Sequence, residues 1–213
     1  MCGIVGIWRF DGAPVDVAAV ERAADSIRHR GPDDEGYLLV NTTVGQNVSC
    51  GGKDTDSNLR LPSIASFRDQ YFDLVLGFRR LSILDLSPAG HQPMSSADAR
   101  LSIVFNGEIY NYRELRSELK EIGFSFLTET DTEVILAAYT RWGKSCLEHF
   151  NGMFAFAIWD SVDQSLFIAR DRFGEKPLFY SYIPGKLFAF ASEMKALWAA
   201  GVVERTVHQA AGY

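Results

Sequence analysis

The amino-acid sequence predicts an α+β fold in which two antiparallel sheets stack on each other and helices cover their outer faces. Strand-like segments fall into two groups along the chain, and the second group is dense in Phe and Ile with short turns between the strands. Two or three amphipathic helices accompany them. Because the apolar face of each sheet needs a partner layer, stacking the sheets with the helices outside buries all of these faces.

Composition limits the classes of protein to which the chain can belong. It has 213 residues, of which 47% are hydrophobic, enough for one sizeable core. A formal charge of −6 argues against nucleic acid or an anionic membrane surface as a partner. No apolar run reaches the roughly 18 residues of a spanning helix. In a signal peptide the basic residues come before the apolar run, whereas here Arg9 follows the first apolar run. We therefore expect a cytoplasmic protein.

The cysteines and histidines are scattered along the chain. The three cysteines show no paired spacing, and no two of the four histidines are spaced as metal ligands on one helix face. We therefore expect neither a disulfide framework nor a metal site.

The first elements follow from short-range patterns. Residues 3–8 form an apolar run with β-branched residues, which predicts a buried strand with Cys2 at its start. From Asp16, apolar residues at helical spacing predict a helix that ends before Gly31-Pro32. The charged segment 28–36 is either a solvated loop or a loop that packs beside the N-terminal strand and frames a site.

Five further strands are predicted from short apolar runs, at residues 37–40, 73–79, 81–84, 101–105 and 124–127. Between them, residues 41–72 are rich in Gly, Asn, Ser and Asp, and we expect a long, mobile insertion. Residues 85–97 contain Pro88 and Pro93 and are expected to be irregular. Asn106-Gly107 is predicted to form a turn after its strand.

Two central helices have clear boundary signals. The first is predicted over 112–122, because Gly123 closes it. Thr130 is predicted to cap a second helix that runs through Trp142, and Glu133 is predicted to complete a capping box.

The last part of the domain is predicted to be an antiparallel meander of four strands, at residues 153–160, 164–170, 178–182 and 187–191. One domain therefore spans residues 1–200. Residues 201–213 lack a strong pattern, and we expect a linker toward a second domain.

The opening triplet Met1-Cys2-Gly3 offers a nucleophile. If Met1 is removed, the thiol of Cys2 and an α-amine with a pKa near ~8 belong to the same residue. A nucleophile and a usable general base then stand together without a distant histidine. Taken alone, a cysteine after the initiator methionine is ordinary, so the rest of the chain must support this chemistry.

Three other motifs suit the recognition and hydrolysis of an amino-acid amide. The Asn106 side chain and the Gly107 N–H can stabilise an oxyanion. Arg80 suits a carboxylate through its bidentate guanidinium, and Asp131 and Glu108 suit an ammonium. Each motif also has an ordinary explanation. Asn106-Gly107 could be a common turn, and Arg80 could belong to a surface ion pair. Asp131 could be an acid that the helix dipole favours at a helix start. Their joint occurrence is more specific than any one of them.

With these motifs the sequence resembles the glutaminase domain of class II glutamine amidotransferases, in the asparagine synthetase-type branch. The matching stretches are Met1–Gly6, Arg28–Asp34, Arg80–Asp85, Phe105–Tyr112, Thr130–Ile135, Asn151–Trp159 and Ala169–Tyr180. The resemblance implies an N-terminal nucleophile hydrolase fold, a four-layer α-β-β-α sandwich.

The resemblance also implies the chemistry. Cys2, after loss of Met1, attacks the side-chain amide of glutamine, forms a glutamyl thioester and releases ammonia, and water then hydrolyses the thioester. Catalytic roles fall on Cys2, Asn106 and Gly107. The residues that match substrate-binding positions are Arg80 for the α-carboxylate, with Leu81, Ile83 and Leu84 beside it, Asn106 and Gly107 for the oxyanion, and Glu108 and Asp131 for the α-amino group.

The chain departs from the family in what it lacks. The Ser-Gly-Gly-x-Asp-Ser phosphate loop of the synthetase domain is absent, so ATP and Mg are expected only in that domain and no cofactor in this chain. The chain is either a fragment or a free-standing partner of an ammonia-accepting synthetase domain or subunit. The acceptor of the ammonia is either aspartate or a sugar acid of surface-polysaccharide synthesis. A third hypothesis is that the chain is a non-catalytic module that binds glutamine. Homodimer formation stays open.

The motif Asp171–Pro177 also belongs to the family pattern. Gly174–Lys176 lacks the leading glycine and the trailing Ser or Thr of a phosphate loop, which argues against a nucleotide site. We expect this motif to have a structural role, or to lie at a face that meets a second domain.

Overall fold

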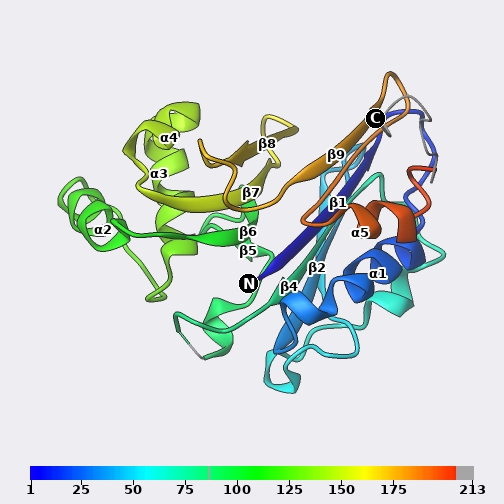
Figure 1. Ribbon diagram of the computed structural model, residues 1–213, viewed down its shortest axis with the longest axis horizontal. Coiled ribbons are helices and arrows are strands. Elements are labelled where there is room, and N and C mark those ends of the chain that lie inside the picture. The colour runs from blue at the N-terminus through cyan, green and yellow to red at the C-terminus, as the bar shows by residue number, and fades with distance from the viewer. Residues whose placement is uncertain (86, 205–213) are drawn as a thin grey trace, which may run out of the picture.

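The computed structural model describes residues 1–85 and 87–204, which form ten strands and five α-helices (Figure 1). In chain order they are β1 (Gly3–Arg9), α1 (Val17–Ser26), β2 (Asp34–Asn41), β3 (Gln46–Cys50), β4 (Leu74–Arg80), β5 (Met94–Ser95), β6 (Leu101–Ile109), α2 (Tyr112–Glu121), α3 (Asp131–Trp142), α4 (Cys146–His149), β7 (Gly152–Asp160), β8 (Ser165–Arg170), β9 (Phe179–Ile183), β10 (Leu187–Ala191) and α5 (Met194–Ala199). Within the described ranges, no helix is long and apolar enough to cross a membrane.

These elements form four layers. A six-stranded sheet with the order β3-β2-β4-β1-β10-β9 lies against a four-stranded sheet with the order β5-β6-β7-β8, and all neighbouring strands are antiparallel. Helices α1 and α5 cover the outer face of the large sheet, and α2, α3 and α4 cover that of the small sheet (Figure 1). The predicted sandwich of two stacked sheets with outer helices is confirmed.

Alternation along the strands separates three apolar layers. On β1, Val5 and Ile7 face α1, whereas Ile4 faces the small sheet. On β6, Phe105 faces the helices on its own side, whereas Val104 faces the large sheet. Because each fully buried side chain of this kind contributes about 1.5–3 kcal/mol, the middle layer holds the two sheets firmly together and fixes β1 relative to β6.

The helix starts follow their capping residues. As predicted, α1 begins after Asp16 and α3 begins after Thr130, whose hydroxyl accepts the N–H of Glu133 at 3.3 Å. The second half of the predicted capping box is wrong. The Glu133 carboxylate accepts the N–H groups of Leu127 and Thr128, at 2.8 Å each, and so fixes the segment that leads into α3.

The predicted turn at Asn106-Gly107 is wrong, because β6 runs straight through both residues. The pairing of β6 with β7 continues as far as Ile109 opposite Gly152. A β-carbon on Gly107 would run into the carbonyl oxygen of Met153. The glycine therefore serves the close approach of two strands, and long-range pairing outweighs the local turn preference of the dipeptide.

Residues 41–72 are folded, which corrects the prediction of a mobile insertion. Their first part is β3, which pairs with β2, and Cys50 and Ile64 are buried in the layer under α1. The guanidinium of Arg79, which is almost fully buried, also binds the carboxylate of Asp54 at 2.7 Å. These long-range contacts involve residues in a segment whose polar composition alone indicates a loop.

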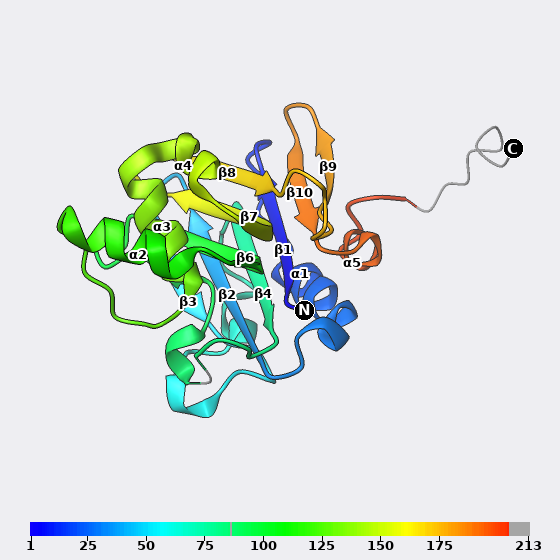
Figure 2. The same ribbon diagram turned by 60° about the vertical axis from the view of Figure 1, so that its left-hand side comes forward.

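Three smaller corrections concern two predicted strands and the predicted meander. Residues 81–84 and 124–127 form no strand. Residues 171–178 carry the chain from the small sheet to the large one, so β7–β8 and β9–β10 belong to different sheets instead of one meander. Figure 2 shows the β9–β10 hairpin beside β1, at the edge of the large sheet. Of the predicted linker, residues 205–213 lie outside the described residues.

Candidate active site

Cys2 immediately precedes β1 and packs against the apolar layer between the sheets. Its sulfur accepts the backbone N–H of Leu81 at 3.4 Å and lies 3.6 Å from the carbonyl oxygen of the same residue. Burial raises the pKa of the Cys2 thiol, and the contact with the Leu81 backbone offsets only part of that increase. The thiol form therefore prevails at neutral pH, so a nucleophilic role requires a base that removes its proton.

Within the segment 28–36, the part that precedes β2 packs beside Cys2, as one of the two sequence interpretations proposed. Nε of Arg30 donates to the carbonyl oxygen of Cys2 at 2.9 Å, and Nη1 forms an ion pair with Glu193 at 3.1 Å. Gly31 lies so close to β4 that a β-carbon would overlap the backbone of Arg79 and Arg80. The loop thus fixes the N-terminal residues against the large sheet.

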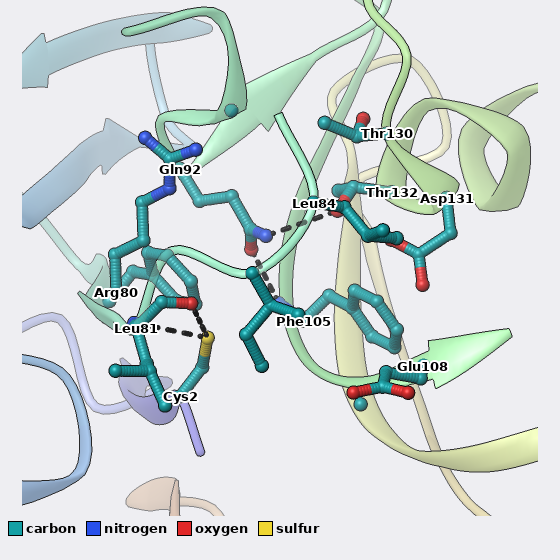
Figure 3. A pocket seen from close by; sticks show the side chains of 14 residues that line it. Cys2, Arg80, Leu81, Leu84, Gln92, Phe105, Glu108, Thr130, Asp131 and Thr132 are labelled. Carbon is teal, nitrogen blue, oxygen red and sulfur yellow. Dashed lines mark hydrogen bonds between the residues drawn. The ribbon is translucent and has the colours of Figure 1, made fainter. Parts of the chain in front are cut away.

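A cavity opens beside the Cys2 sulfur (Figure 3). It is lined by residues from the start of β1, the end of β4, the loop that follows β4, β6 and the start of α3. They are Cys2, Phe78, Arg80, Leu81, Ile83, Leu84, Gly90, Gln92, Phe105, Gly107, Glu108, Thr130, Asp131 and Thr132. The structure therefore brings together all of the site residues predicted from the sequence except Asn106, which lies behind the cavity wall.

Beyond its short pairing with β5, the edge of β6 presents alternate backbone N–H groups to the cavity. The N–H of Phe105 donates to Oε1 of Gln92 at 2.7 Å, and the N–H of Ile109 donates to Oδ2 of Asp131 at 3.0 Å. Because alternate residues of a strand direct their N–H groups to the same edge, the N–H of Gly107 lies between these two and faces the cavity.

The Asn106 side chain is buried without a partner. It is 1% exposed, and among the described residues neither its amide nitrogen nor its oxygen forms a hydrogen bond. Its neighbour Phe105 faces the outer helices, so alternation directs Asn106 toward the layer between the sheets, which also contacts Cys2. Leaving such a group unsatisfied costs about 1–3 kcal/mol, which suggests that a ligand completes it.

Arg80 lies in the cavity wall with its guanidinium engaged by the following loop. Nη1 donates to the carbonyl oxygen of Ser87 at 2.9 Å, and Nη2 donates to that of Asp85. Gly90 packs against the guanidinium so closely that a β-carbon there would overlap it. Arg80 therefore holds the loop that follows β4, and the residue also lines the cavity.

Two carboxylates face the cavity opposite Cys2 and Arg80 (Figure 3). Burial raises the pKa of Asp131 to about 6, and the nearby Glu108 charge adds to the increase, whereas the N–H of Ile109 lowers it. A cation bound between these carboxylates would relieve their repulsion and favour the charged form of Asp131. The arrangement suits an ammonium group.

The sequence did not identify Gln92 or Thr132 as site residues. Nε2 of Gln92 donates to the hydroxyl of Thr132 at 3.2 Å while its oxygen holds the Phe105 N–H. Gln92 therefore connects β6 to the start of α3. No local spacing signals this bridge, because its partners lie 13 and 40 residues away.

The other cysteines lie in the apolar layers. Cys50 and Cys146 are free thiols that are fully buried, and burial raises the pKa of each to about 12. In the part of the chain that the structure describes, no three His, Cys, Asp or Glu side chains are placed to hold a metal ion. Among the three thiols, only Cys2 lines the cavity described above.

The sequence matches known proteins along most of its length. The profile of the glutamine amidotransferase domain family matches residues 64–212. Asparagine synthetase (glutamine-hydrolysing) 1 of Bacillus subtilis is 40% identical over 205 residues, which cover 94% of this chain and 27% of that protein. Asparagine synthetase (glutamine-hydrolysing) 3 of the same organism is 35% identical over 202 residues, which cover 93% of this chain and 28% of that protein.

A solved structure shares the fold. Glutamine phosphoribosylpyrophosphate amidotransferase from B. subtilis, complexed with ADP and GMP, matches with a TM-score of 0.73 and 22% sequence identity, over 94% of this chain and 44% of that chain. The N-terminal nucleophile hydrolase fold implied by the resemblance is confirmed. This chain spans little more than a quarter of the length of the two synthetases. The profile match shows that the chain belongs to the family of class II glutamine amidotransferase domains.

Proposed function

We propose that this chain hydrolyses L-glutamine to glutamate and ammonia, with Cys2 as the nucleophile once Met1 has been removed. The proposal rests on the residues that line one cavity, where the Cys2 thiol lies opposite two carboxylates and beside an arginine. These are the groups that an α-amino acid with a reactive side-chain amide requires. Membership of the glutamine amidotransferase domain family supports glutamine as that amino acid.

In this proposal the charges of the cavity hold the two ends of the substrate backbone. The guanidinium of Arg80 binds the α-carboxylate, and the backbone of Leu81, Ile83 and Leu84 lies beside it. Glu108 and Asp131 receive the α-ammonium on the opposite wall. The side chain of glutamine then extends toward the Cys2 sulfur.

Acylation uses the two groups of Cys2 together. Its α-amine takes the thiol proton, directly or through a water, and the sulfur forms a bond to the amide carbon. The side-chain amide of Asn106 and the N–H of Gly107 donate to the resulting oxyanion, and each such donor contributes about 2.7–4 kcal/mol of transition-state stabilisation. The carbon–nitrogen bond then breaks, and the Cys2 ammonium returns its proton to the departing ammonia.

Deacylation reverses these roles. The α-amine of Cys2 takes a proton from water, whose oxygen forms a bond to the thioester carbon. When the carbon–sulfur bond breaks, the thiolate recovers that proton and glutamate leaves. Neither step needs a metal or cofactor from this chain.

The ammonia passes to an ATP-dependent synthetase domain or subunit in this proposal. The lengths of the relatives support it, because this chain covers only 27% and 28% of two proteins named as asparagine synthetases. Aspartate is then the acceptor, and ATP and Mg bind outside this chain. The three free cysteines support a cytoplasmic, reducing location.

Measurement of ammonia and glutamate release from glutamine tests the proposal. The unaltered protein should form both products in equal amounts, and Cys2→Ala should reduce the rate at least about 10³-fold. Cys146→Ala is the matched control, because it removes a thiol outside the cavity and should retain activity if the variant stays folded. Ammonia release by Cys2→Ala at the unaltered rate would rule out the proposed nucleophile.

The acceptor is tested in a protein that includes the synthetase region. Asparagine should form from aspartate, glutamine and ATP with one glutamate for each asparagine. Amidation of a sugar acid with no asparagine would replace aspartate as the acceptor and leave the glutaminase proposal intact. Tight glutamine binding without turnover would instead identify a binding module.

A further inference from the structure

The side-chain amide of Gln92 is buried at the cavity and is hydrogen-bonded at both ends (Figure 3). The residue is 5% exposed. Its Oε1 accepts the N–H of Phe105 at 2.7 Å, and its Nε2 donates to the hydroxyl of Thr132 at 3.2 Å. Because a backbone N–H requires an acceptor, the first bond determines which end of the amide faces β6. One side chain thus ties the middle of β6 to the first turn of α3.

The side chain of Gln92 makes this contact because β5 separates from β6 early. The two strands pair only over residues 94–95 of β5. Two further residues in the same register would bring the backbone of Gln92 opposite Phe105 and close the edge of β6 with main-chain groups. The side chain satisfies the N–H of Phe105 instead, so the edge beyond it stays open to the cavity at Gly107.

The backbone of Gln92 is itself held by the large sheet. A β-carbon on Gly36 would overlap the carbonyl oxygen of Gln92, so β2 and this loop are in close contact. The neighbouring His91 lies against the buried carboxylate of Asp34, with 2.7 Å between Nδ1 and Oδ2. The bridge from Gln92 to β6 and α3 therefore starts from a point that the large sheet fixes.

Two ties join β6 to the start of α3, one on each side of Gly107. Gln92 makes the first through Phe105. The carboxylate of Asp131 makes the second by accepting the N–H of Ile109 at 3.0 Å. In the proposed mechanism Asp131 also receives the substrate ammonium, so its tie is shared with the substrate. The bridge through Gln92 uses no group that is assigned to the substrate, and it is therefore the tie that persists during catalysis.

We propose that Gln92 is a positioning residue that fixes the span between the oxyanion donor at Gly107 and the ammonium site at Asp131, and so selects the length of the amide substrate. This inference rests on the proposed function, because it requires a substrate that is anchored at one end and reacts with Cys2 at the other. Glutamine and asparagine carry the same charged groups and differ by one methylene group, so the span distinguishes them. A loosened span slows the substrate that fits it more than the one that does not.

The ratio of kcat/KM for glutamine to kcat/KM for asparagine tests the inference. The unaltered protein should favour glutamine by about 10–200-fold, the usual effect of one methylene group. Gln92→Met keeps the length of the side chain but loses both hydrogen bonds, and it should lower kcat/KM for glutamine and the ratio about tenfold each. Gln46→Met is the matched control, because it alters an exposed glutamine on β3 and should change neither. Equal losses with both substrates would indicate a structural role and overturn the inference.

Thr132→Val tests the bridge from its other end and leaves the bond to Phe105 in place. It removes the hydroxyl with little change in the shape of the side chain, and it should lower the ratio in the same direction. If both residues act through one bridge, the double variant should lose no more kcat/KM for glutamine than Gln92→Met alone. Losses that multiply in the double variant would contradict a common bridge.

Failure of this inference is distinct from failure of the proposed function. If the unaltered protein releases no ammonia from glutamine, the proposed function fails and the inference fails with it. If the unaltered protein hydrolyses glutamine and the ratio is unmoved in both Gln92→Met and Thr132→Val, only the inference is refuted.

Discussion

Two polar side chains at the site, Asn106 and Asp131, are unfavourably placed in the free protein, and bound glutamine would relieve both. The amide of Asn106 has no hydrogen-bond partner in the described chain. The carboxylate of Asp131 is buried beside that of Glu108, which raises its pKa. A site with these properties trades stability of the free protein for interactions with substrate and transition state.

Asn106 should affect catalysis far more than stability. We expect Asn106→Ala to reduce kcat about 10²–10³-fold, because one oxyanion donor is lost, with little change in KM. Since the amide has no partner in the free protein, the free energy of unfolding should stay within about 1 kcal/mol of the original value. Steady-state kinetics and urea unfolding check both effects. Retained activity together with a large loss of stability would assign Asn106 a structural role only.

Asp131 should make glutamine binding depend on pH. Its pKa of about 6 in the free protein means that the carboxylate loses its charge as the pH falls through 6. KM should therefore rise between pH 7 and pH 5. Asp131→Asn should have a KM about 10–100-fold higher at pH 8, as expected for loss of a charged hydrogen bond, with little pH dependence. An unchanged KM would exclude contact with the substrate ammonium.

The same pKa predicts how Asp131 affects stability. Because it is raised from the usual 3.8 to about 6, the folded protein holds this proton more tightly than the unfolded chain. The resulting stabilisation is complete below pH 3.8 and is lost as the pH rises through 6. Asp131→Asn should therefore stabilise the free protein at pH 8, by on the order of 2–3 kcal/mol, and have little effect near pH 4. Thermal unfolding at both pH values measures this difference.

At the level of elements, the start of α3 connects the fold to the site. Thr130 caps the helix, and Asp131 and Thr132 then enter the cavity wall from its first turn. The Glu133 carboxylate holds the preceding segment through Leu127 and Thr128. The cap therefore sets the position of the carboxylate proposed to bind the substrate ammonium.

Loss of the cap should weaken both stability and binding. We expect Thr130→Ala to reduce the free energy of unfolding by about 1 kcal/mol and to raise KM, because Asp131 is less well fixed. Thr130→Ser retains the hydroxyl and should behave like the unaltered protein. Chemical unfolding and steady-state kinetics measure the two effects. An unchanged KM in a destabilised Thr130→Ala would show that the cap serves the helix alone.

Local patterns predicted the elements whose signals lie within one segment. The strand that follows Cys2, the helix after Asp16 and the helix after Thr130 are all confirmed. Asn106-Gly107 failed as a turn because pairing along β6 and β7 outweighs dipeptide preference. Residues 41–72 failed as a mobile insertion because burial of Cys50 and pairing of β3 depend on distant partners.

At the scale of the whole molecule, the stacked sheets bring distant segments to one cavity. The sequence motifs identified Cys2, Arg80 and Asp131, because each has a distinctive chemical role, and the structure places all three in its wall. Gln92 could not be identified in this way, since it acts by bridging Phe105 and Thr132. A bridge between elements has no signature in the local sequence.

The position of each cysteine in the layers determines which thiol a substrate can reach. Cys2 precedes a strand in the interior of the sheet and lies at the cavity. Cys50 and Cys146 are buried under the outer helices, and burial raises their pKa to about 12. A glutamine analogue should therefore distinguish Cys2 from the other two by access and by reactivity.

The most direct test of the account is the site of covalent labelling by a diazoketone analogue of glutamine, read by intact mass and peptide mapping. The account predicts a protein that lacks Met1 and carries one label on Cys2, with labelling blocked by excess glutamine. Retention of Met1, or a label on Cys50 or Cys146 in place of Cys2, would contradict it.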